Sequence, residues 1–416
     1  MKVLKFGGAS IKDADGVRNL KQALDKIGYK NIVLVVSAMG KMTNAFEQLV
    51  ETHIIDGDEF ENFSFIKDFH ESILKDLFND KEHFVFEKVN DLLDDLNGFL
   101  FNNNSSDYNF VYDQIVGYGE LLSTTICSTY LLENGIENTW LDIRKCIKTN
   151  SDFRRAKVDW ETTSILLNKK INKSKLIITQ GFIASDNFGK TTTLGREGSD
   201  YTAAIIAHCI GAKEVNIFKD VAGVFNADPK EFEHTVLLSQ ISYKEAIEMA
   251  FFGASVIHPK TLQPLQRKEI PLFVKSFINP LEKGTLVSKG LDIDPKVPCF
   301  IVKKNQMLIS ISDKDFHFVM EDDISEIFDY LHQFKLKVNL IQNSAISFTV
   351  CIEDNFNKFD TLIQKLQIKY KVLYNKNLTL YTVRHFTKNA IEEIEKNKEV
   401  LVKQWSRETT QIVVRN

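Results

Sequence analysis

The stretch from Thr191 to Ala204 joins a fixed positive charge to the expected start of a helix. It reads TTTLGREGSDYTAA, in which Gly195 and Gly198 allow tight turns and Arg196 offers a planar guanidinium suited to a carboxylate or phosphate. Ser199 is expected to cap the helix that follows. Because amides at a helix N-terminus favour anions, we interpret this stretch as an anion-binding loop.

Five further blocks of distinctive residues are ordered along the chain. The Gly7-Gly8 pair follows an expected strand that contains Lys5, so backbone amides of this turn can reach phosphate oxygens and the lysine ammonium can reach a terminal phosphate. The chain has no Gly-x-x-x-x-Gly-Lys-[Ser/Thr] motif, so a Walker-type loop is excluded. The blocks are KFGGAS (5–10), VVSA (35–38), GELLS (119–123), KDVAGVFNADP (219–229) and GASVIHP (253–259).

Strand and helix patterns alternate through the first part of the chain. The apolar run from Ile32 to Val36 is typical of a strand buried on both faces, and Val17, Leu20 and Leu24 share one helix face. This alternation predicts an α/β fold, a mostly parallel open sheet with helices on both faces. Ligands of such sheets bind beyond the carboxyl ends of the strands, where the blocks lie. Further strands are expected at 3–6, 176–179, 215–218 and 272–274.

A phenylalanine-rich segment follows a different pattern. From about 55 to 105, apolar residues recur at helical spacing with many charges between them, which predicts a helical hairpin beside the sheet. Its aromatic residues, among them Phe65, Phe69, Phe84 and Phe86, are expected in the core. A polar turn at 102–106 ends the hairpin.

Composition describes a soluble globular protein of two or three domains, because 416 residues exceed one usual hydrophobic core. The net charge of −4 gives no general field for nucleic acid, and no apolar run approaches the ~20 residues that span a bilayer. The first residues are interpreted as a core strand and not as a signal peptide. Five scattered cysteines show no metal-ligand or disulfide spacing, so we expect free thiols and a cytoplasmic location.

In their order the blocks resemble those of the aspartate kinases of the amino-acid kinase family, over about the first 290 residues. The resemblance implies a catalytic domain at 1–290 that uses ATP and Mg²⁺, with the metal held mainly by substrate phosphates and no dedicated protein metal site. It implies that Lys5 stabilises the transferring phosphoryl group and that Asp200 orients Lys5 by a short ion pair. A solvated strand lysine and an ordinary helix-start carboxylate are the alternative interpretations.

The acceptor implied by the resemblance is an amino acid. Its α-carboxylate would pair with Arg196 and its α-ammonium with Glu120, which leaves the side-chain carboxylate free to face ATP. The resemblance also assigns Ser37, Thr43 and Ser199 to the substrate. An exposed helix glutamate is the alternative for Glu120.

The nucleotide side departs from the family pattern. This chain has Lys219, Phe225, Lys230 and Ser255 at positions where the family has Thr, Tyr, Arg and Lys, respectively. Ser255 removes a cation that Lys219 could partly restore, and these changes concern ATP affinity more than the reaction class. The residues implied to bind the nucleotide are Lys5, Gly7, Gly8, Ser10, Lys219, Asp220, Phe225, Lys230, Ser255 and Val256.

After a connector near 280–298 the pattern becomes βαββαβ, which resembles an ACT domain, an α+β ligand-sensing fold. We expect a first ACT-like domain at 306–375 and a second, shortened one at 298–305 and 376–416, with separate strands at 300–303 and 307–311. Asn339 and Ala345 stand where lysine-sensitive kinases carry two carboxylates, so weak or altered lysine binding is predicted. The tail is expected to build a homodimer, and a higher oligomer is the alternative.

The function that the resemblance implies is phosphoryl transfer from ATP to the side-chain carboxylate of L-aspartate, the first step toward lysine, threonine and methionine. Two alternatives remain. Another amino-acid kinase, acting on glutamate or acetylglutamate, would lack a comparable tail. A catalytically idle amino-acid sensor would explain the nucleotide-side changes but not the intact Lys5.

Overall fold

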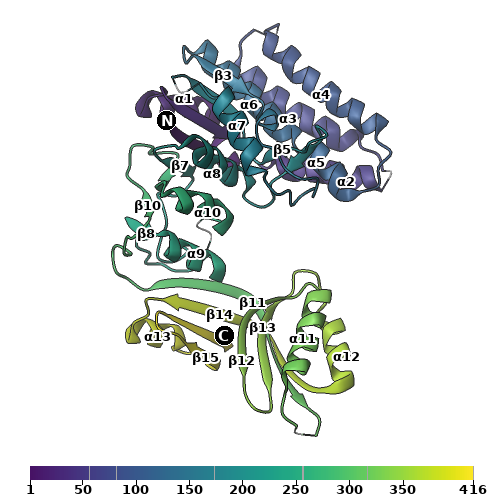
Figure 1. The fold of residues 1–416 in the computed structure, drawn as a ribbon, viewed down its shortest axis with the longest axis vertical. Helices are drawn as coiled ribbons and strands as arrows, with labels where there is room; N and C mark the ends of the chain where they lie inside the picture. The colour runs from purple at the N-terminus through teal and green to yellow at the C-terminus, as the bar shows by residue number, and fades with distance from the viewer. Residues whose placement is uncertain (56, 81, 173, 255–256, 316, 416) are drawn as a thin grey trace. The chain divides into compact units, whose positions relative to one another are not determined.

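The computed structural model describes residues 1–416 except 56, 81, 173, 255–256, 316 and 416, and it divides into two compact units (Figure 1). The first unit contains Met1–Val224, Leu237–Ile247 and Ile257–Ile293. The second contains Phe225–Val236, Glu248–Val256 and Asp294–Asn416. Within the described residues, every helix is too short or too polar to cross a membrane.

An eight-stranded sheet forms the centre of the first unit, in the order β3-β4-β2-β1-β7-β9-β10-β8. Neighbouring strands pair in parallel except β9 with β10, so the predicted mostly parallel sheet is confirmed. Strands β2 and β4 are buried at every residue, as expected of strands covered on both faces. The strands are β1 Lys2–Phe6, β2 Ile32–Val36, β3 Asn138–Leu141, β4 Leu176–Gln180, β7 Val215–Lys219, β8 Gln240–Ser242, β9 Leu272–Ser276 and β10 Thr285–Ser288.

Alternate side chains of the central strands face opposite helical layers. Leu4 and Phe6 of β1 join a core that includes side chains of α1, α2 and α6. Lys5 lies between them in the strand and therefore faces the other side, where α8 packs against β1. The helices of the unit include α1 Ala14–Ile27, α2 Met42–Ile54, α5 Tyr108–Val116, α6 Tyr118–Glu133, α7 Trp160–Lys170, α8 Gly198–Ile210 and α10 Pro259–Lys268; α9 is Tyr243–Phe252.

Short elements connect the larger ones at the carboxyl edge of the sheet. The 3₁₀ helices η1 Gly8–Ile11 and η2 Ile143–Lys145 follow β1 and β3 directly. The two-stranded antiparallel pair β5 Ile183–Ser185 and β6 Thr191–Thr193 precedes α8. The anion-binding loop predicted from the sequence therefore spans β6 and the first turns of α8.

The predicted helical hairpin is confirmed as α3 Phe60–Leu77 and α4 Phe84–Asn102. One face of each helix is buried, through residues such as Ile73 and Leu93. The prediction that the aromatic residues are all core is wrong, because Phe65 and Phe84 are 57% and 48% exposed. Both helices are amphipathic, and these two side chains lie away from the buried faces.

A six-stranded antiparallel sheet forms most of the second unit, in the order β12-β13-β11-β14-β16-β15. It is an α+β arrangement, as expected of ACT-like domains. The strands are β11 Cys299–Asp313, β12 Lys337–Asn343, β13 Phe348–Glu353, β14 Tyr370–Arg384, β15 Glu399–Trp405 and β16 Thr409–Arg415, and the helices are α11 Glu321–Gln333, α12 Phe359–Lys369 and α13 Lys388–Glu395.

The separate strands expected at 300–303 and 307–311 are one continuous strand, β11, which pairs with an equally long β14. Asn305 adopts a left-handed conformation, with φ of 55°, and the pairing register shifts on both sides of Gln306. Asparagine tolerates this conformation well, so the polar interruption of the pattern marks a bulge and not the end of a strand.

Candidate active site

Lys5 and Asp200 form a buried ion pair between β1 and the first turn of α8. Nζ of Lys5 lies 2.7 Å from Oδ1 of Asp200, and the two residues are 9% and 3% exposed. Nζ of Lys219, at the end of the neighbouring strand β7, lies 3.9 Å from the other carboxylate oxygen of Asp200. Two ammonium groups thus face one carboxylate, and the resulting net positive charge favours an anionic group at this edge of the sheet.

The Gly7-Gly8 turn passes very close to neighbouring groups. A Cβ atom on Gly8 would lie 2.6 Å from the carbonyl oxygen of Ala38, so only glycine fits there. A Cβ atom on Gly7 would lie 3.3 Å from Nζ of Lys5. The buried Ser10 donates its backbone N–H to the carbonyl of Gly7 at 2.9 Å. The backbone of this half-buried turn therefore lies close to the Lys5 ammonium.

Glu120 is a buried carboxyl group in the first turn of α6, and it is 2% exposed. Its Oε1 accepts a hydrogen bond of 3.3 Å from the backbone N–H of Ala38, while Oε2 has no partner among the described residues. Burial raises the pKa of Glu120 to about 8. A cationic ligand would compensate the buried charge, which makes this carboxyl a candidate ligand for an ammonium group.

The hydroxyl-bearing candidates lie near the ends of β2 and α2. Ser37 follows β2 directly and is half-buried, and its carbonyl accepts a 2.7 Å hydrogen bond from Oγ of Ser123 in α6. Thr43 is half-buried in the first turn of α2. Through Ala38 and Ser123, the structure brings the Ser37 segment and Glu120 together.

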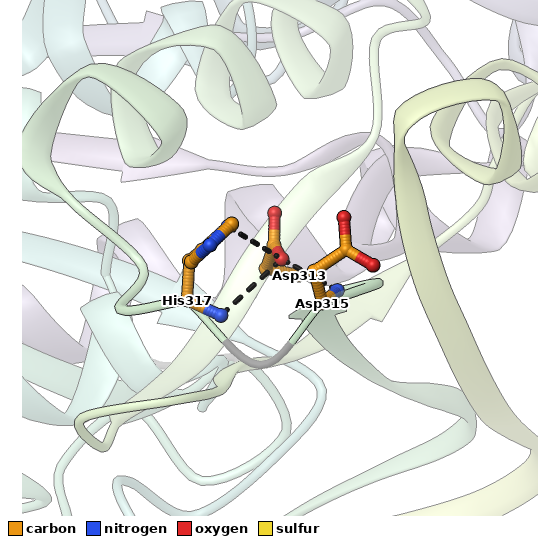
Figure 2. Close-up of side chains that lie close together, drawn as sticks. All are labelled: Asp313, Asp315 and His317. Atoms are coloured by element: carbon orange, nitrogen blue, oxygen red, sulfur yellow. Dashed lines mark hydrogen bonds and ion pairs between the residues drawn. The ribbon is translucent and has the colours of Figure 1, made fainter.

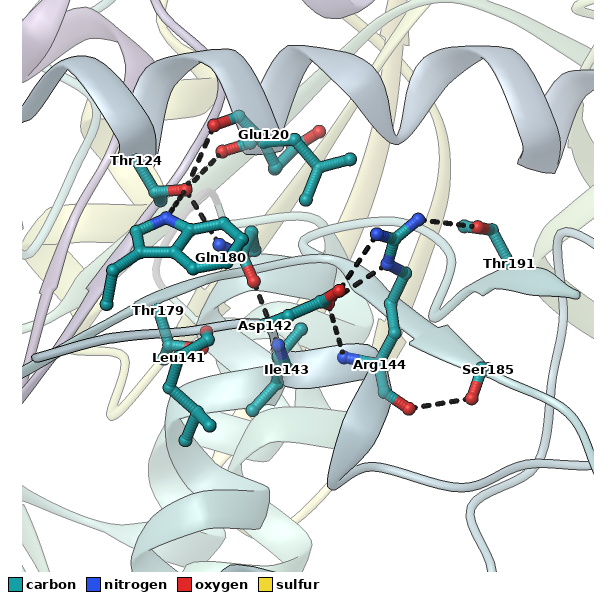
Figure 3. Close-up of polar contacts among 12 residues, drawn as sticks. Glu120, Thr124, Leu141, Asp142, Ile143, Arg144, Thr179, Gln180, Ser185 and Thr191 are labelled. Atoms are coloured by element: carbon teal, nitrogen blue, oxygen red, sulfur yellow. Dashed lines mark hydrogen bonds and ion pairs between the residues drawn. The ribbon is translucent and has the colours of Figure 1, made fainter. Parts of the chain in front are cut away.

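A network of polar contacts connects α6 with the ends of β3 and β4 (Figure 3). Oγ1 of Thr124 accepts hydrogen bonds from Nε2 of Gln180 at 2.7 Å and from Nε1 of Trp140 at 3.0 Å. Farther along, Arg144 pairs with both carboxylate oxygens of Asp142 at 3.0 and 2.9 Å. Sequence reasoning missed this network, because Thr124, Gln180 and Trp140 belong to different elements and lie outside the distinctive blocks.

Arg196 is exposed at the start of α8 and makes no ion pair within the described part of the chain. It is therefore available to a ligand. The predicted cap by Ser199 is wrong: α8 begins at Gly198, and Glu197 occupies the preceding position in a left-handed conformation with no side-chain cap. Ser199 is instead buried against Gly181, where a Cβ atom would lie 2.4 Å from Cβ of Ser199. This close approach fixes α8 against the end of β4.

The predicted nucleotide-binding residues are divided by the structure. Lys219 belongs to the first unit beside Asp200, and Asp220 follows it as an exposed residue. Phe225, half-buried, and Lys230, exposed, belong to the second unit. Ser255 and Val256 lie outside the described residues.

One cluster of possible metal ligands occurs among the described residues, formed by Asp313, Asp315 and His317 (Figure 2). Oδ1 of Asp313 accepts backbone N–H groups of Asp315 at 2.7 Å and His317 at 3.3 Å. The carboxylate therefore stabilises the turn after β11, and two of the three side chains are exposed. Such a turn accounts for the cluster without a metal ion.

The family model for the amino acid kinase family matches residues 1–276. The chain belongs to this family. The lysine-sensitive aspartokinase 3 of Escherichia coli (strain K12) is 34% identical to it over 356 residues, which cover 84% of this chain and 78% of the relative. The match therefore confirms membership in the aspartokinase branch that the ordered blocks predicted.

Two further comparisons agree. The chloroplastic aspartokinase 1 of Arabidopsis thaliana is 29% identical over 363 residues, which cover 84% of this chain and 63% of that longer protein. A crystal structure of E. coli aspartokinase III in complex with aspartate and ADP has a TM-score of 0.81 and 28% identity, and the match covers 100% of this chain and 96% of that one.

Proposed function

We propose that this chain is an ATP-dependent aspartate kinase that converts L-aspartate to 4-phospho-L-aspartate. The observation that carries the proposal is the buried Lys5–Asp200 pair beside the half-buried Gly7-Gly8 turn, with Lys219 as a second cation. The family membership and the aspartate and ADP named for the E. coli structure support it. We propose this reaction as the first step toward lysine, threonine and methionine.

The proposed chemistry is direct in-line displacement. An oxygen of the aspartate side-chain carboxylate attacks the γ-phosphorus, the bond to the bridging oxygen of the β-phosphate breaks, and ADP leaves with the electron pair. No general base is required, because the attacking carboxylate is ionised at neutral pH. Lys5 stabilises charge on the transferring phosphoryl group, and Asp200 holds Lys5 in place. Mg²⁺, bound through phosphate oxygens, would neutralise further charge.

The two ends of the amino acid are assigned to different helices. Glu120, with its unpartnered buried oxygen, pairs with the α-ammonium, and the exposed Arg196 pairs with the α-carboxylate. Ser37, Thr43 and Ser199 complete the substrate side as hydrogen-bonding residues. The glycine turn with Ser10, together with Lys219, Asp220, Phe225, Lys230, Ser255 and Val256, remains the predicted nucleotide side.

The buried Glu120 also separates this proposal from its nearest rival. An acylated substrate such as N-acetylglutamate has no ammonium to compensate the buried carboxylate. An idle sensor would have no use for the Lys5–Asp200 pair. A coupled spectrophotometric assay of ADP release, with L-aspartate, L-glutamate and N-acetylglutamate as acceptors, distinguishes the aspartate kinase, the other amino-acid kinase and the idle sensor. Of the three compounds, only L-aspartate is expected to be phosphorylated. Absence of turnover with L-aspartate refutes the proposal.

For the C-terminal region we propose ACT-like domains at 306–375 and at 298–305 with 376–416. β12 and β15 are the outer strands of their sheet, and Ile341 of β12 is 42% exposed. These features support a homodimer formed by pairing of ACT-type sheets. None of the five cysteines, all of which the structure describes, forms a disulfide, in accord with the proposed cytoplasmic location. Light scattering at micromolar concentration tests the dimer, and a monomer would refute it.

A further inference from the structure

The hydroxyl group of Thr124 uses its full hydrogen-bonding capacity at a fully buried position. It accepts from Nε2 of Gln180 at 2.7 Å and from Nε1 of Trp140 at 3.0 Å, and it donates to the carbonyl oxygen of Glu120 at 2.8 Å (Figure 3). We call these three contacts the Thr124 bridge. The bridge ends on the backbone of the residue whose carboxyl group is the candidate ammonium ligand.

The far side of the bridge is also held. Gln180 is fully buried at the end of β4, and its Oε1 accepts a 2.9 Å hydrogen bond from the backbone N–H of Ile143. Trp140 belongs to β3. The first turn of α6 is thus tied to two strand ends, and Ser123 ties it to a third through Ser37. Among the buried side-chain oxygen and nitrogen atoms of Glu120, Ser123, Thr124 and Gln180, only Oε2 of Glu120 has no hydrogen-bond partner within the described residues.

We propose that Thr124 is a positioning residue for the substrate ammonium, because its bridge fixes the helical turn that carries Glu120. The inference rests on the proposed function. Thr124 and Glu120 are four residues apart and lie on the same helix face. A buried ion pair is favourable only when its geometry is closely kept, so a small displacement of this turn weakens ammonium binding. ATP, which Glu120 does not contact in this assignment, would bind as before.

Thr124→Val tests the inference, since it keeps the side-chain shape and removes the hydroxyl. The KM for aspartate should rise about tenfold, as expected when buried donors lose their acceptor, while kcat and the KM for ATP stay within about twofold. Thr124→Ser retains the hydroxyl and should keep the KM for aspartate within about twofold. Gln180→Leu should also raise the KM for aspartate. In the Thr124→Val/Gln180→Leu double variant, the increase in this KM should be smaller than the product of the two single effects. Trp140→Phe is a milder variant should Thr124→Val not fold.

Thr163→Val is the matched control. Thr163 of α7 is also fully buried, and its hydroxyl oxygen accepts from the backbone N–H of Lys148 at 3.0 Å. The melting temperature of Thr163→Val should fall by about as much as that of Thr124→Val, but the KM of Thr163→Val for aspartate should not change. An unchanged KM for aspartate in Thr124→Val, or equal effects on the aspartate and ATP KM values, would overturn the inference. Absence of aspartate turnover in the wild type would instead refute the proposed function.

Discussion

The burial of Glu120 predicts that aspartate affinity depends on pH. With a pKa of about 8 in the ligand-free protein, only about one tenth of this carboxyl is ionised at pH 7. Aspartate requires the ionised form, so the apparent Kd equals the intrinsic Kd divided by this fraction. Affinity at pH 7 should therefore be about tenfold below its limit at higher pH, and about tenfold weaker again near pH 6.

Two measurements check this prediction. The KM for aspartate, at saturating ATP, should fall as pH rises from about 6 to about 8. Calorimetry in buffers with different ionisation enthalpies should show release of about 0.9 proton on aspartate binding at pH 7. Glu120→Gln cannot ionise, so its affinity for aspartate should be weak and nearly independent of pH in this range.

The same shift has a consequence for the stability of the ligand-free protein. A carboxyl whose pKa is higher in the folded state than in the unfolded state binds its proton more tightly in the folded state. Its contribution to stability is therefore greatest at low pH and is lost once the carboxyl is ionised in both states. Stability should therefore fall as pH rises from about 4.5, the unfolded value, to about 8, and Glu120→Gln should reduce this dependence. A pH-independent KM for aspartate in the wild type would refute the reasoning. Release of as many protons on aspartate binding to Glu120→Gln as on binding to the wild type would refute it as well.

Three other predictions concern the proposed binding groups. Lys5→Ala should lower kcat about 100-fold or more with little change in aspartate binding, and an unchanged kcat at saturating substrates would contradict its role. Arg196→Ala should raise the KM for aspartate about tenfold or more without lowering the melting temperature, because Arg196 is exposed. Arg196→Lys should recover only part of the wild-type affinity for aspartate. A change in the KM for ATP alone would contradict the assignment of Arg196 to aspartate. Lysine should bind weakly in calorimetry, because Oδ1 of Asn339 already accepts a 2.7 Å hydrogen bond from Nζ of Lys303; tight lysine binding that is lost in Asn339→Ala would be the opposite result.

Much of the catalytic unit could be predicted from the sequence, because parallel strands buried on both faces leave long apolar runs. The order of the blocks brought Lys5 and Asp200 together in the prediction, and the structure pairs them at 2.7 Å. Their roles remain predictions. The Thr124 bridge could not be foreseen, since two of its contacts, with Gln180 and Trp140, join α6 to other elements through residue types that are common in any core. Nothing in the local sequence fixes which buried glutamine meets which threonine.

The errors have local physical causes. A serine directly after a glycine is a reasonable helix cap, but α8 starts earlier, after the left-handed Glu197, and Ser199 is buried. In the second unit, the sequence pattern predicts separate strands at 300–303 and 307–311, whereas the left-handed Asn305 lets β11 continue between them. Propensity rules locate such interruptions and do not tell a bulge from a turn.

The continuous pairing of β11 with β14 has a consequence for modularity. Lys303 and Leu380 are cross-strand partners, although residues 304–379 separate them in the chain. A short hairpin turn could join these neighbours and leave residues 380–384 of β14, together with β15 and β16, in register. The segment between them is therefore inserted at a point where its two ends already meet. An architecture of this kind can gain, lose or exchange the inserted module during evolution while the host sheet keeps its hydrogen bonds.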